Sequence, residues 1–281
     1  MTKEFWYPDW VSWRFGVALR GTATHDKMKL LFCVTLQSIP QGITKRLPHR
    51  VKDGIERLAD KLAANVVVKV GNVKYVLVDS ESLTIVSPLS EPWFPMKVKK
   101  REVFLDVGAH IGKYSLLVAK TVKDSLVISV EPHPINYQAL KKGVQLNSLN
   151  NVIPINIAAW KQKCKKKLFI AKKAGRHTLE SHRVIPKQYS GASIIVEAEP
   201  LDSILQKFNI RKLHLIKIDA EDAELEVLHG LKKTLRTHPT LIIESRHPYE
   251  VKEFLRQFGY ASYLLAENNL LFFPEKDSTH P

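Results

Sequence analysis

The spacing of apolar residues changes once along the chain, close to residue 65. Before that point, apolar residues recur at helical intervals in PDWVSWRFGVALRG and RVKDGIERLADKLAA, which predicts a small helical N-terminal extension over residues 1–62. This extension carries an aromatic stripe made of Trp6, Trp10 and Trp13. Such a stripe favours a packing face, with dimerisation or substrate capping as the alternative.

From residue 63 to 281 the pattern is that of an α/β domain. VVVKVGNVKYVLV predicts a β-hairpin over 66–78. From about residue 102, apolar runs alternate with helical patterns; the runs are VFLDVG, LVISVEP, VIPINIAAW, LHLIKIDA and PTLIIES. The helical patterns are GKYSLLVAKTV, INYQALKKGVQLNS, AELEVLHGLKKTL and PYEVKEFLRQFG. Strands that are apolar throughout predict a mostly parallel sheet with helices on both faces, and YASYLLAENNLLFFP predicts a terminal hairpin.

The charge of the chain indicates polyanionic partners. It carries 43 Lys+Arg against 28 Asp+Glu, a formal charge of +15. That excess favours RNA, anionic lipid headgroups or phosphorylated substrates, or else a lysine-rich surface that serves solubility. Two cysteines, Cys33 and Cys164, are too few for a disulfide framework or a zinc site, which indicates a reducing, cytoplasmic compartment. The N-terminus lacks a signal-peptide pattern, and the longest apolar stretch, about 12 residues, is too short to span a bilayer.

A glycine-containing turn follows the first strand of the predicted sheet. LDVGAHIG places Asp106, Gly108 and Gly112 where this strand ends and a helix begins. A dinucleotide site needs G-x-G-x-x-G, and this turn has two glycines with His110 between them, so that pattern fails. An acid before the glycines suits a ligand with a cationic amino group and no phosphate. At the end of the next strand, Glu131 can take both hydroxyls of a ribose.

Four segments, in this order, resemble the FkbM-type methyltransferases, which use S-adenosylmethionine (SAM): VFLDVGAHIGKYS, VISVEPHPINYQALKKGVQLN, INIAAW and LIKIDAEDAELEVLHGL. EAEPLDSIL and PTLIIES also fall where that family has comparable segments. The resemblance runs from about residue 66 to 273. It implies a Rossmann-like class I methyltransferase fold with SAM as the cofactor.

The resemblance also implies roles for individual residues. Asp106, Gly108 and Gly112 would surround the amino acid end of SAM, Glu131 would bind its ribose, and residues 156–159 would lie by its adenine. The implied cofactor site comprises Asp106, Gly108, Ala109, His110, Gly112, Glu131, Pro132, Asn156, Ala158, Ala159 and Asp219. One departure is Asp222, because the family usually has glycine after D-x-E.

The segment IKIDAEDAELEVL holds five carboxylates in an otherwise basic chain. Asp219 and Glu221 follow a strand, so we expect them at the binding edge of the sheet, and the resemblance places them beside the methyl donor. Asp222 and Glu224 are expected in the first turn of the next helix, where the helix dipole favours acids, and Glu226 on its solvated surface. A hard cation held by the clustered carboxylates is the alternative, but no further spaced ligand set supports a metal site.

Methylation of an alcohol also calls for a base, and four residues are candidates. Besides Asp219 and Glu221, Glu244 ends the strand TLIIE at the same edge of the sheet, and His177 lies in the loop AGRHTLESH, which we expect to face the acceptor. The alternative for His177 and His110 is a surface or hydrogen-bonded core position.

The segment WKQKCKKKLFIAKK, residues 160–173, contains seven lysines in fourteen positions. It is either an exposed edge strand whose lysines prevent edge-to-edge pairing with other strands, or a binding surface for the phosphates of RNA, a nucleotide sugar or a phosphoglycan. Three functions follow from these patterns. The first is a SAM-dependent methyltransferase that O-methylates a hydroxyl of a sugar, glycan or related small molecule; the second is a tRNA or rRNA methyltransferase. The third is a cofactor-binding scaffold without catalysis.

Overall fold

The computed structural model describes residues 16, 19–38, 46–87, 98–180, 189–266 and 268–275. The predicted tryptophan stripe and the first predicted helix fall almost entirely outside these ranges. Within the described ranges, no helix has both the length and the apolar character needed to cross a bilayer.

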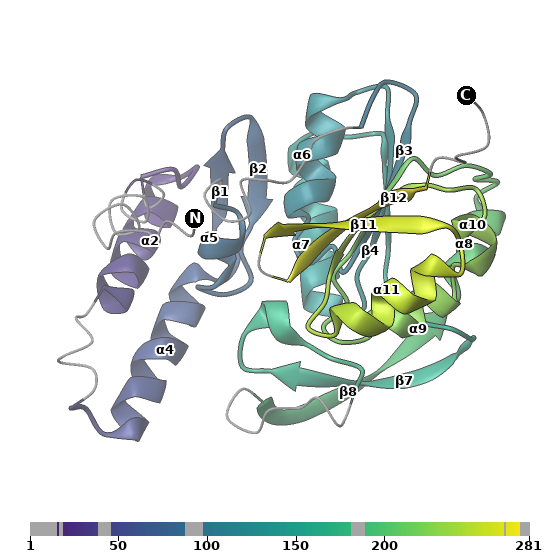
Figure 1. The fold of residues 1–281 in the computed structure, drawn as a ribbon. Coiled ribbons are helices and arrows are strands. Elements are labelled where there is room, and N and C mark those ends of the chain that lie inside the picture. Colours follow the sequence, from purple (N-terminus) through teal and green to yellow (C-terminus); the bar gives the residue numbers. More distant parts are fainter. Residues whose placement is uncertain are drawn as a thin grey trace.

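The core of the chain is a seven-stranded sheet in the order β11-β12-β10-β9-β3-β4-β5 (Figure 1). The five strands β5, β4, β3, β9 and β10 run parallel, and β12 and β11 join antiparallel at one edge. Their bounds are β3 (Val103–Val107), β4 (Leu126–Val130), β5 (Val152–Ile155), β9 (Leu215–Ile218), β10 (Thr240–Glu244), β11 (Tyr260–Ala266) and β12 (Asn269–Pro274). The predicted mostly parallel α/β sheet and its terminal hairpin are confirmed.

Helices cover both faces of this sheet (Figure 1). One face carries α6 (Lys113–Thr121) and α7 (Pro134–Leu146), and the other carries α8 (Leu201–Lys207), α9 (Glu224–His229), α10 (Lys232–Leu235) and α11 (Pro248–Arg256). Side chains alternate along β3, so that Leu105 and Val107 pack in the core beneath α8, α9 and α11 while Phe104 packs beside α6. Apolar residues on both faces of one strand explain why these strands are apolar throughout.

The single helix predicted over AELEVLHGLKKTL is wrong, because the chain forms α9 and α10 there. Asp202, at the start of α8, accounts for the break. Its carboxylate accepts hydrogen bonds from the backbone N–H groups of Lys233 (2.8 Å) and Thr234 (3.0 Å), and its own N–H donates to the carbonyl of Gly230 (3.0 Å). A side chain that caps α10 from outside the segment therefore replaces one continuous helix.

A second sheet of three strands, in the order β6-β8-β7, lies beside the carboxyl ends of the main strands. Its members are β6 (Ala158–Ala159), β7 (Cys164–Ala171) and β8 (Tyr189–Glu199). The segment VIPINIAAW thus divides into β5 and β6, which belong to different sheets, and β8 was not predicted. The lysine segment supplies β7, the edge strand of this sheet.

The N-terminal part packs against the α6–α7 layer. It consists of α2 (Thr24–Gln37), α4 (His49–Ala63), the antiparallel pair β1 (Val67–Val70) and β2 (Val73–Val76), and the short helix α5 (Ser82–Ile85). Leu30 of α2 and Ala63 of α4 share one apolar core with Val68 of the hairpin and with Leu116 and Leu140 of α6 and α7. The division at residue 62 stays a prediction, since this core extends across it.

Candidate active site

A cavity of about 430 Å³ lies at the carboxyl ends of the parallel strands. Each central strand contributes a residue at or just after its end: Gly108 after β3, Glu131 after β4, Asp219 after β9 and Glu244 on β10. Ligands of open α/β sheets bind at this edge, so the sequence-based location agrees with the geometry. Of the predicted site residues, the cavity is also lined by Ala109, His110, Pro132, Ala158, Ala159, His177 and Glu221, whereas Asp106, Gly112 and Asn156 do not line it.

The two glycines of the β3–α6 turn serve different purposes. Gly108 has φ +77°, and a Cβ there would overlap the backbone carbonyl of Asp219, so glycine lets the ends of β3 and β9 adjoin. Gly112 has φ +88°, and a Cβ there would collide with the side chains of Leu140 and Leu116. It therefore permits α6 and α7 to pack and takes no part in the cavity wall.

Asp106 lies beneath the turn, in the core. Its Oδ2 accepts hydrogen bonds from Ser115 Oγ (2.6 Å) and from the Ser115 N–H (3.1 Å), and Ser129 Oγ donates to Ser115 Oγ at 2.7 Å. Burial raises the pKa of the Asp106 carboxyl, while Lys217 and the Ser115 donors oppose that rise. The resemblance implies a place beside the cofactor for Asp106, but here it ties β3 to the start of α6.

Glu131 is held by the backbone of two turns. Its Oε2 accepts from the His110 N–H (2.9 Å), and its Oε1 accepts from the His133 N–H (2.9 Å) and from Asn136 Nδ2 (3.4 Å). The side chain is buried, and this burial raises its pKa to about 7 against the opposing effect of the N–H donors. Asn156 supports the same strand end from outside the cavity, because its Nδ2 donates to the Glu131 carbonyl at 2.8 Å.

Lys217 is a cavity residue that the sequence reasoning missed. It is 2% exposed, and its Nζ lies 3.0 Å from Asp219 Oδ2. The sequence held a signal, because a lysine in the middle of the apolar strand LIKI needs a buried anionic partner. Lys217 also pairs in register with Asp106 of β3, so one ammonium lies between two carboxylates.

Glu221 and Asp222 form a clamp with Arg246, a second residue that was missed. Arg246 donates from Nη2 to Glu221 Oε2 (2.9 Å) and from Nη1 to Asp222 Oδ2 (2.8 Å). Burial and the nearby Asp219 raise the pKa of the Glu221 carboxyl to about 8, while Arg246 opposes the rise.

The expectation that Asp222 lies in the first turn of the next helix is wrong, since α9 begins at Glu224, whereas the same expectation for Glu224 is confirmed. Asp222 has φ +77° and Glu221 has φ +48°, both left-handed, and the Glu224 carboxylate accepts from the Asp222 N–H at 3.1 Å. The left-handed backbone of Asp222 explains why glycine suits this position. In this chain the buried carboxylate of Asp222 gains Arg246 as its partner. Glu226 is half-buried and paired with Lys161 at 3.1 Å, so it does lie at the surface of α9.

His177 and His110 are both neutral in this environment. His177 Nδ1 accepts from the Ala171 N–H (3.1 Å), which leaves the ring hydrogen on Nε2, and burial lowers its pKa to about 3. Burial likewise lowers the pKa of His110 to about 4, and both its ring nitrogens are buried without a partner among the described residues. These rings can donate hydrogen bonds into the cavity. In the described part of the chain, no group of three or more His, Cys, Asp or Glu side chains is placed to hold a metal.

Comparisons with known proteins place the chain in a family. Over 142 residues it is 22% identical to "Methyltransferase 1" of Beauveria bassiana, covering 45% of this chain and 57% of that protein. Over 56 residues it is 43% identical to the tRNA(Phe) (4-demethylwyosine(37)-C(7)) aminocarboxypropyltransferase of Methanocaldococcus jannaschii, covering 20% and 22%. The chain thus spans less than two thirds of the length of these relatives.

Among solved structures, the M. jannaschii TYW2 in complex with AdoMet matches with 18% identity and a TM-score of 0.39, covering 73% of this chain and 82% of that chain. The model of the methyltransferase FkbM domain matches residues 106–262, which is more than half of the chain and confirms the resemblance seen in the sequence. The chain therefore belongs to the FkbM methyltransferase family.

Proposed function

We propose that this chain transfers a methyl group from SAM to an oxygen, namely a hydroxyl of a sugar, glycan or related small molecule. The observation that carries the proposal is that one cavity is lined by two unlike sets of residues. We assign Glu131, His110 and Ala158 to a cofactor half, and Asp219, Glu221, Glu244 and Arg246 to an acceptor half.

The chemistry of the cofactor half fits SAM. Glu131 Oε2 accepts one hydrogen bond from protein, so a lone pair remains for a ribose hydroxyl. His110 supplies buried ring nitrogens that lack a partner among the described residues, and Ala158 and Leu168 offer an apolar wall for an adenine. Asp219, at the boundary with the acceptor half, would supply negative charge for the positively charged sulfur of SAM. These residues would hold the cofactor through its ribose, base and charge.

The acceptor half fits a polyhydroxyl acceptor. Bound SAM would supply a methyl group on a positively charged sulfur. Carboxylates of Glu221 and Glu244 accept hydrogen bonds from hydroxyls, while Arg246 donates them, and this mixture is what a sugar edge requires. Holding the two reactants in line can contribute roughly 7–11 kcal/mol to the rate.

Among the candidate bases, Glu221 suits the task best. Its pKa of about 8 lies near neutral pH, where a base combines adequate strength with partial ionisation. Glu221 would take the proton of the acceptor hydroxyl as the new oxygen–carbon bond forms and the carbon–sulfur bond of SAM breaks, with the sulfur leaving as a neutral thioether. His177 does not suit it, because its hydrogen is on Nε2 and its pKa is lowered to about 3; it serves better as a hydrogen-bond donor to the acceptor.

Transfer of labelled methyl groups from SAM to fractionated cell extract tests the proposal. We expect a labelled product that survives ribonuclease and is altered by glycosidases, and we expect Glu221→Gln to lose about 99% or more of the transfer, roughly the effect of one general base. Glu197→Gln is the matched control, because that carboxylate lies on β8 with its side chain 63% exposed. SAM binding without transfer to any fraction would instead support the scaffold function.

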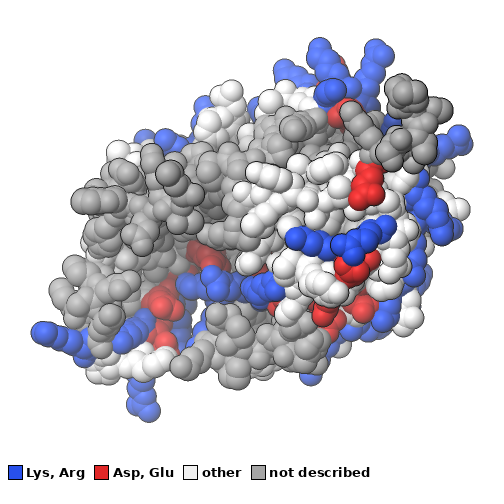
Figure 2. Space-filling model, viewed as in Figure 1, with Lys and Arg blue, Asp and Glu red and all other residues white. Residues whose placement is uncertain are grey.

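The RNA alternative rests on the exposed lysines of residues 160–173. Lys161, Lys163, Lys165 and Lys167 are exposed. Lys161, Lys165 and the less exposed Lys173 are paired with carboxylates. Figure 2 shows the basic side chains of the described residues spread over several parts of the face in view, without one continuous stripe among them. This arrangement favours the edge-strand explanation of the lysines. Salt-sensitive binding of tRNA or rRNA fragments, with a labelled product that ribonuclease destroys, would reverse that preference.

A further inference from the structure

The cavity wall includes residues that lie before the family domain. Glu81 and Ile85 of the α5 region line the cavity together with residues 174–177, which follow β7. The two segments are in close contact, because a Cβ on Gly175 would lie 3.3 Å from Ile85 Cδ1. The N-terminal part therefore does more than cover α6 and α7.

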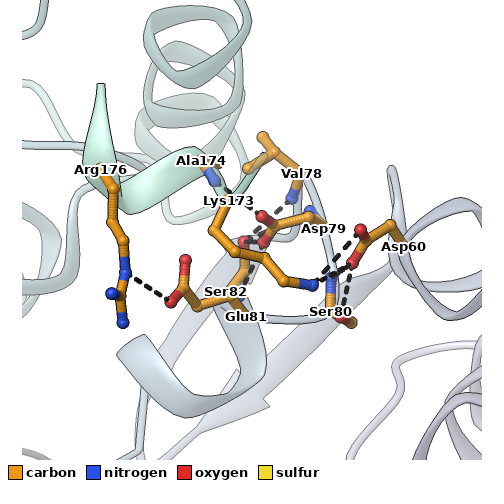
Figure 3. Close-up of polar contacts among 9 residues, drawn as sticks. All are labelled: Asp60, Val78, Asp79, Ser80, Glu81, Ser82, Lys173, Ala174 and Arg176. Carbon is orange, nitrogen blue, oxygen red and sulfur yellow. Dashed lines mark hydrogen bonds and ion pairs between the residues drawn. The ribbon is translucent and has the colours of Figure 1, made fainter. Parts of the chain in front are cut away.

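Asp79 makes the central contact between these segments (Figure 3). Its Oδ1 accepts from the N–H (2.9 Å) and Oγ (2.8 Å) of Ser82, and its Oδ2 accepts from the N–H of Ala174 (2.9 Å). The side chain is 6% exposed. A buried carboxylate with donors on both oxygens fixes the relative position of the two backbones that supply the donors.

Two ion pairs flank this contact on either side (Figure 3). Lys173 Nζ lies 3.2 Å from Asp60 Oδ1 of α4, and Arg176 Nε lies 3.5 Å from Glu81 Oε1. The acids come from the N-terminal part and the cations from the turn over residues 173–176. We call this turn the latch. Because one ion pair lies at each end of the latch, the pairing also fixes the register of the latch against the N-terminal part.

The latch is connected to the cofactor half by one side chain. Asn136 Nδ2 donates to the Ala174 carbonyl at 3.1 Å and also contacts Glu131 Oε1 at 3.4 Å. The peptide groups of Ala174 are therefore held from both sides, by Asp79 at the N–H and by Asn136 at the carbonyl. Displacement of the latch would withdraw a partner from Asn136 and release it from its place beside Glu131.

We propose that Asp79 is a positioning residue for cofactor binding: with Asp60 and Glu81 it holds the latch closed and thereby orients Asn136 and Glu131. The inference rests on the proposed function in one respect, that Glu131 binds SAM. It assigns the N-terminal part a role in the site, since the FkbM domain match begins only at residue 106. Asp79 touches no reacting atom, and its effect passes through Ala174 and Asn136.

The first experiment measures SAM affinity by titration calorimetry with the full chain. Asp79→Asn is expected to bind SAM about tenfold more weakly, because an amide NH₂ then faces the Ala174 N–H in place of a charged acceptor. Asp53→Asn is the matched control, since within the described part of the chain this α4 carboxylate is paired with the exposed His49 alone. Circular dichroism and Tm establish that each variant is folded.

A second variant acts from the other side of the same hydrogen bond. Ala174→Pro removes the N–H that donates to Asp79 Oδ2. Asp79 itself and its hydrogen bonds to Ser82 remain. Lys173 has φ −112° and ψ 136°, the extended conformation that a residue before proline prefers, so the backbone accepts the substitution. We expect a similar loss of SAM affinity. If Asp79→Asn fails to fold, Ala174→Pro and Arg176→Gln decide the question.

A double variant separates positioning from general destabilisation. If Asp79 acts through Glu131, Asp79→Asn should weaken binding less than about twofold in a Glu131→Gln background. Full additivity of the two losses of SAM affinity would overturn the inference, as would unchanged affinity in folded Asp79→Asn and Ala174→Pro.

Trypsin supplies a cofactor-free measurement: cleavage after Lys173 and Arg176 should be about tenfold faster in Asp79→Asn than in wild type. Equal cleavage rates would show that Asp79 does not hold the latch, whereas failure of wild type to bind SAM would refute the proposed function itself.

Discussion

The two halves of the cavity hold their carboxylates by different means. In the cofactor half, Glu131 is fixed by the backbone N–H groups of His110 and His133. In the acceptor half, Asp219 and Glu221 are held by the side chains of Lys217 and Arg246. Backbone donors stay in place whatever side chains surround them, whereas a single substitution removes a cation.

This difference indicates which half is adaptable. A carboxylate held by main-chain groups suits a ligand that does not vary, as a cofactor does not. A carboxylate balanced by long side chains suits an acceptor that differs between relatives, because each substitution changes the charge offered to it. Exposure does not follow the same division, since the Arg246 side chain is 48% exposed whereas Lys217 is 2% exposed, close to the 5% of Glu131. The predictions below test this division.

The largest effect is expected from Lys217→Met in the acceptor half. The substitution leaves Asp219 and Asp106 without the ammonium that lies between them. Removing one partner of a buried ion pair leaves an uncompensated charge, so we expect the free energy of unfolding in urea to fall by about 3 kcal/mol. Lys165→Met is the control, since that lysine is 71% exposed and 3.8 Å from its partner. Equally small losses of the free energy of unfolding in both variants would mean that water screens the charges of the acceptor half.

In the cofactor half, Glu131→Gln tests the backbone anchors. A glutamine oxygen can accept from one of the two N–H groups, but its NH₂ then faces the other donor. The ribose hydroxyl would also lose its charged acceptor, and the loss of such a hydrogen bond costs about 2 kcal/mol, which corresponds to SAM affinity about 30-fold weaker by calorimetry. The control Glu197→Gln should bind as wild type does. A loss of SAM affinity no larger than that of the control would mean that Glu131 does not bind the ribose.

Residues at the ends of the parallel strands were the easiest part of the site to predict from the sequence. The ends of parallel strands meet at one edge of a sheet, so Glu131, Asp219 and Glu244 could be brought together from strand order alone. Asp79 and Glu81 gave no signal, because their place in the cavity wall depends on how the N-terminal hairpin packs against α6 and α7. Arg246 follows β10 directly and could have been found by the rule that located Glu244.

The fold shows the same limit. Strands such as β3 and β4 are apolar at all but one position and were predicted from their own residues. The strand β8 begins YSGAS and leaves Ile195 64% exposed, so neither composition nor burial marked it. The boundary between α9 and α10 is set by Asp202, which lies outside that segment. Local patterns predict elements that bury apolar side chains, and contacts between distant segments decide the rest.

A smaller effect is expected from the residue at which the chain departs from its family. Asp222 has φ +77°, so Asp222→Gly relieves the left-handed backbone while Asp222→Ala does not. Both variants lose the contact with Arg246, so the difference between them reports the backbone alone. We expect Asp222→Ala to be less stable in urea than Asp222→Gly by about 1 kcal/mol. Equal stabilities would show that the loop changes its conformation when the Asp222–Arg246 pair is lost.

The smallest effect is the pH dependence that Glu131 gives to stability. In the unfolded chain its carboxyl loses its proton near the usual value of about 4.5, whereas the folded pKa is raised to about 7. Between these values the folded state binds more protons, so this contribution to the free energy of unfolding is full below pH 4.5 and is lost as pH rises through 7. His110 and His177 act in the opposite direction, because their folded pKa values are lowered to about 4 and about 3.

Subtracting the Glu131→Gln variant isolates Glu131, since the two histidines are present in both proteins. We expect the stability difference, wild type minus variant, to fall by about 0.5 kcal/mol per pH unit from pH 5 to 7, and the roughly 1.4 kcal/mol per pH unit of one whole proton is the upper limit. Urea denaturation at four or five pH values measures it. A difference that stays constant over this range would mean that the anchors offset burial and that Glu131 is ionised throughout, which would make the cofactor half the more strongly charged of the two.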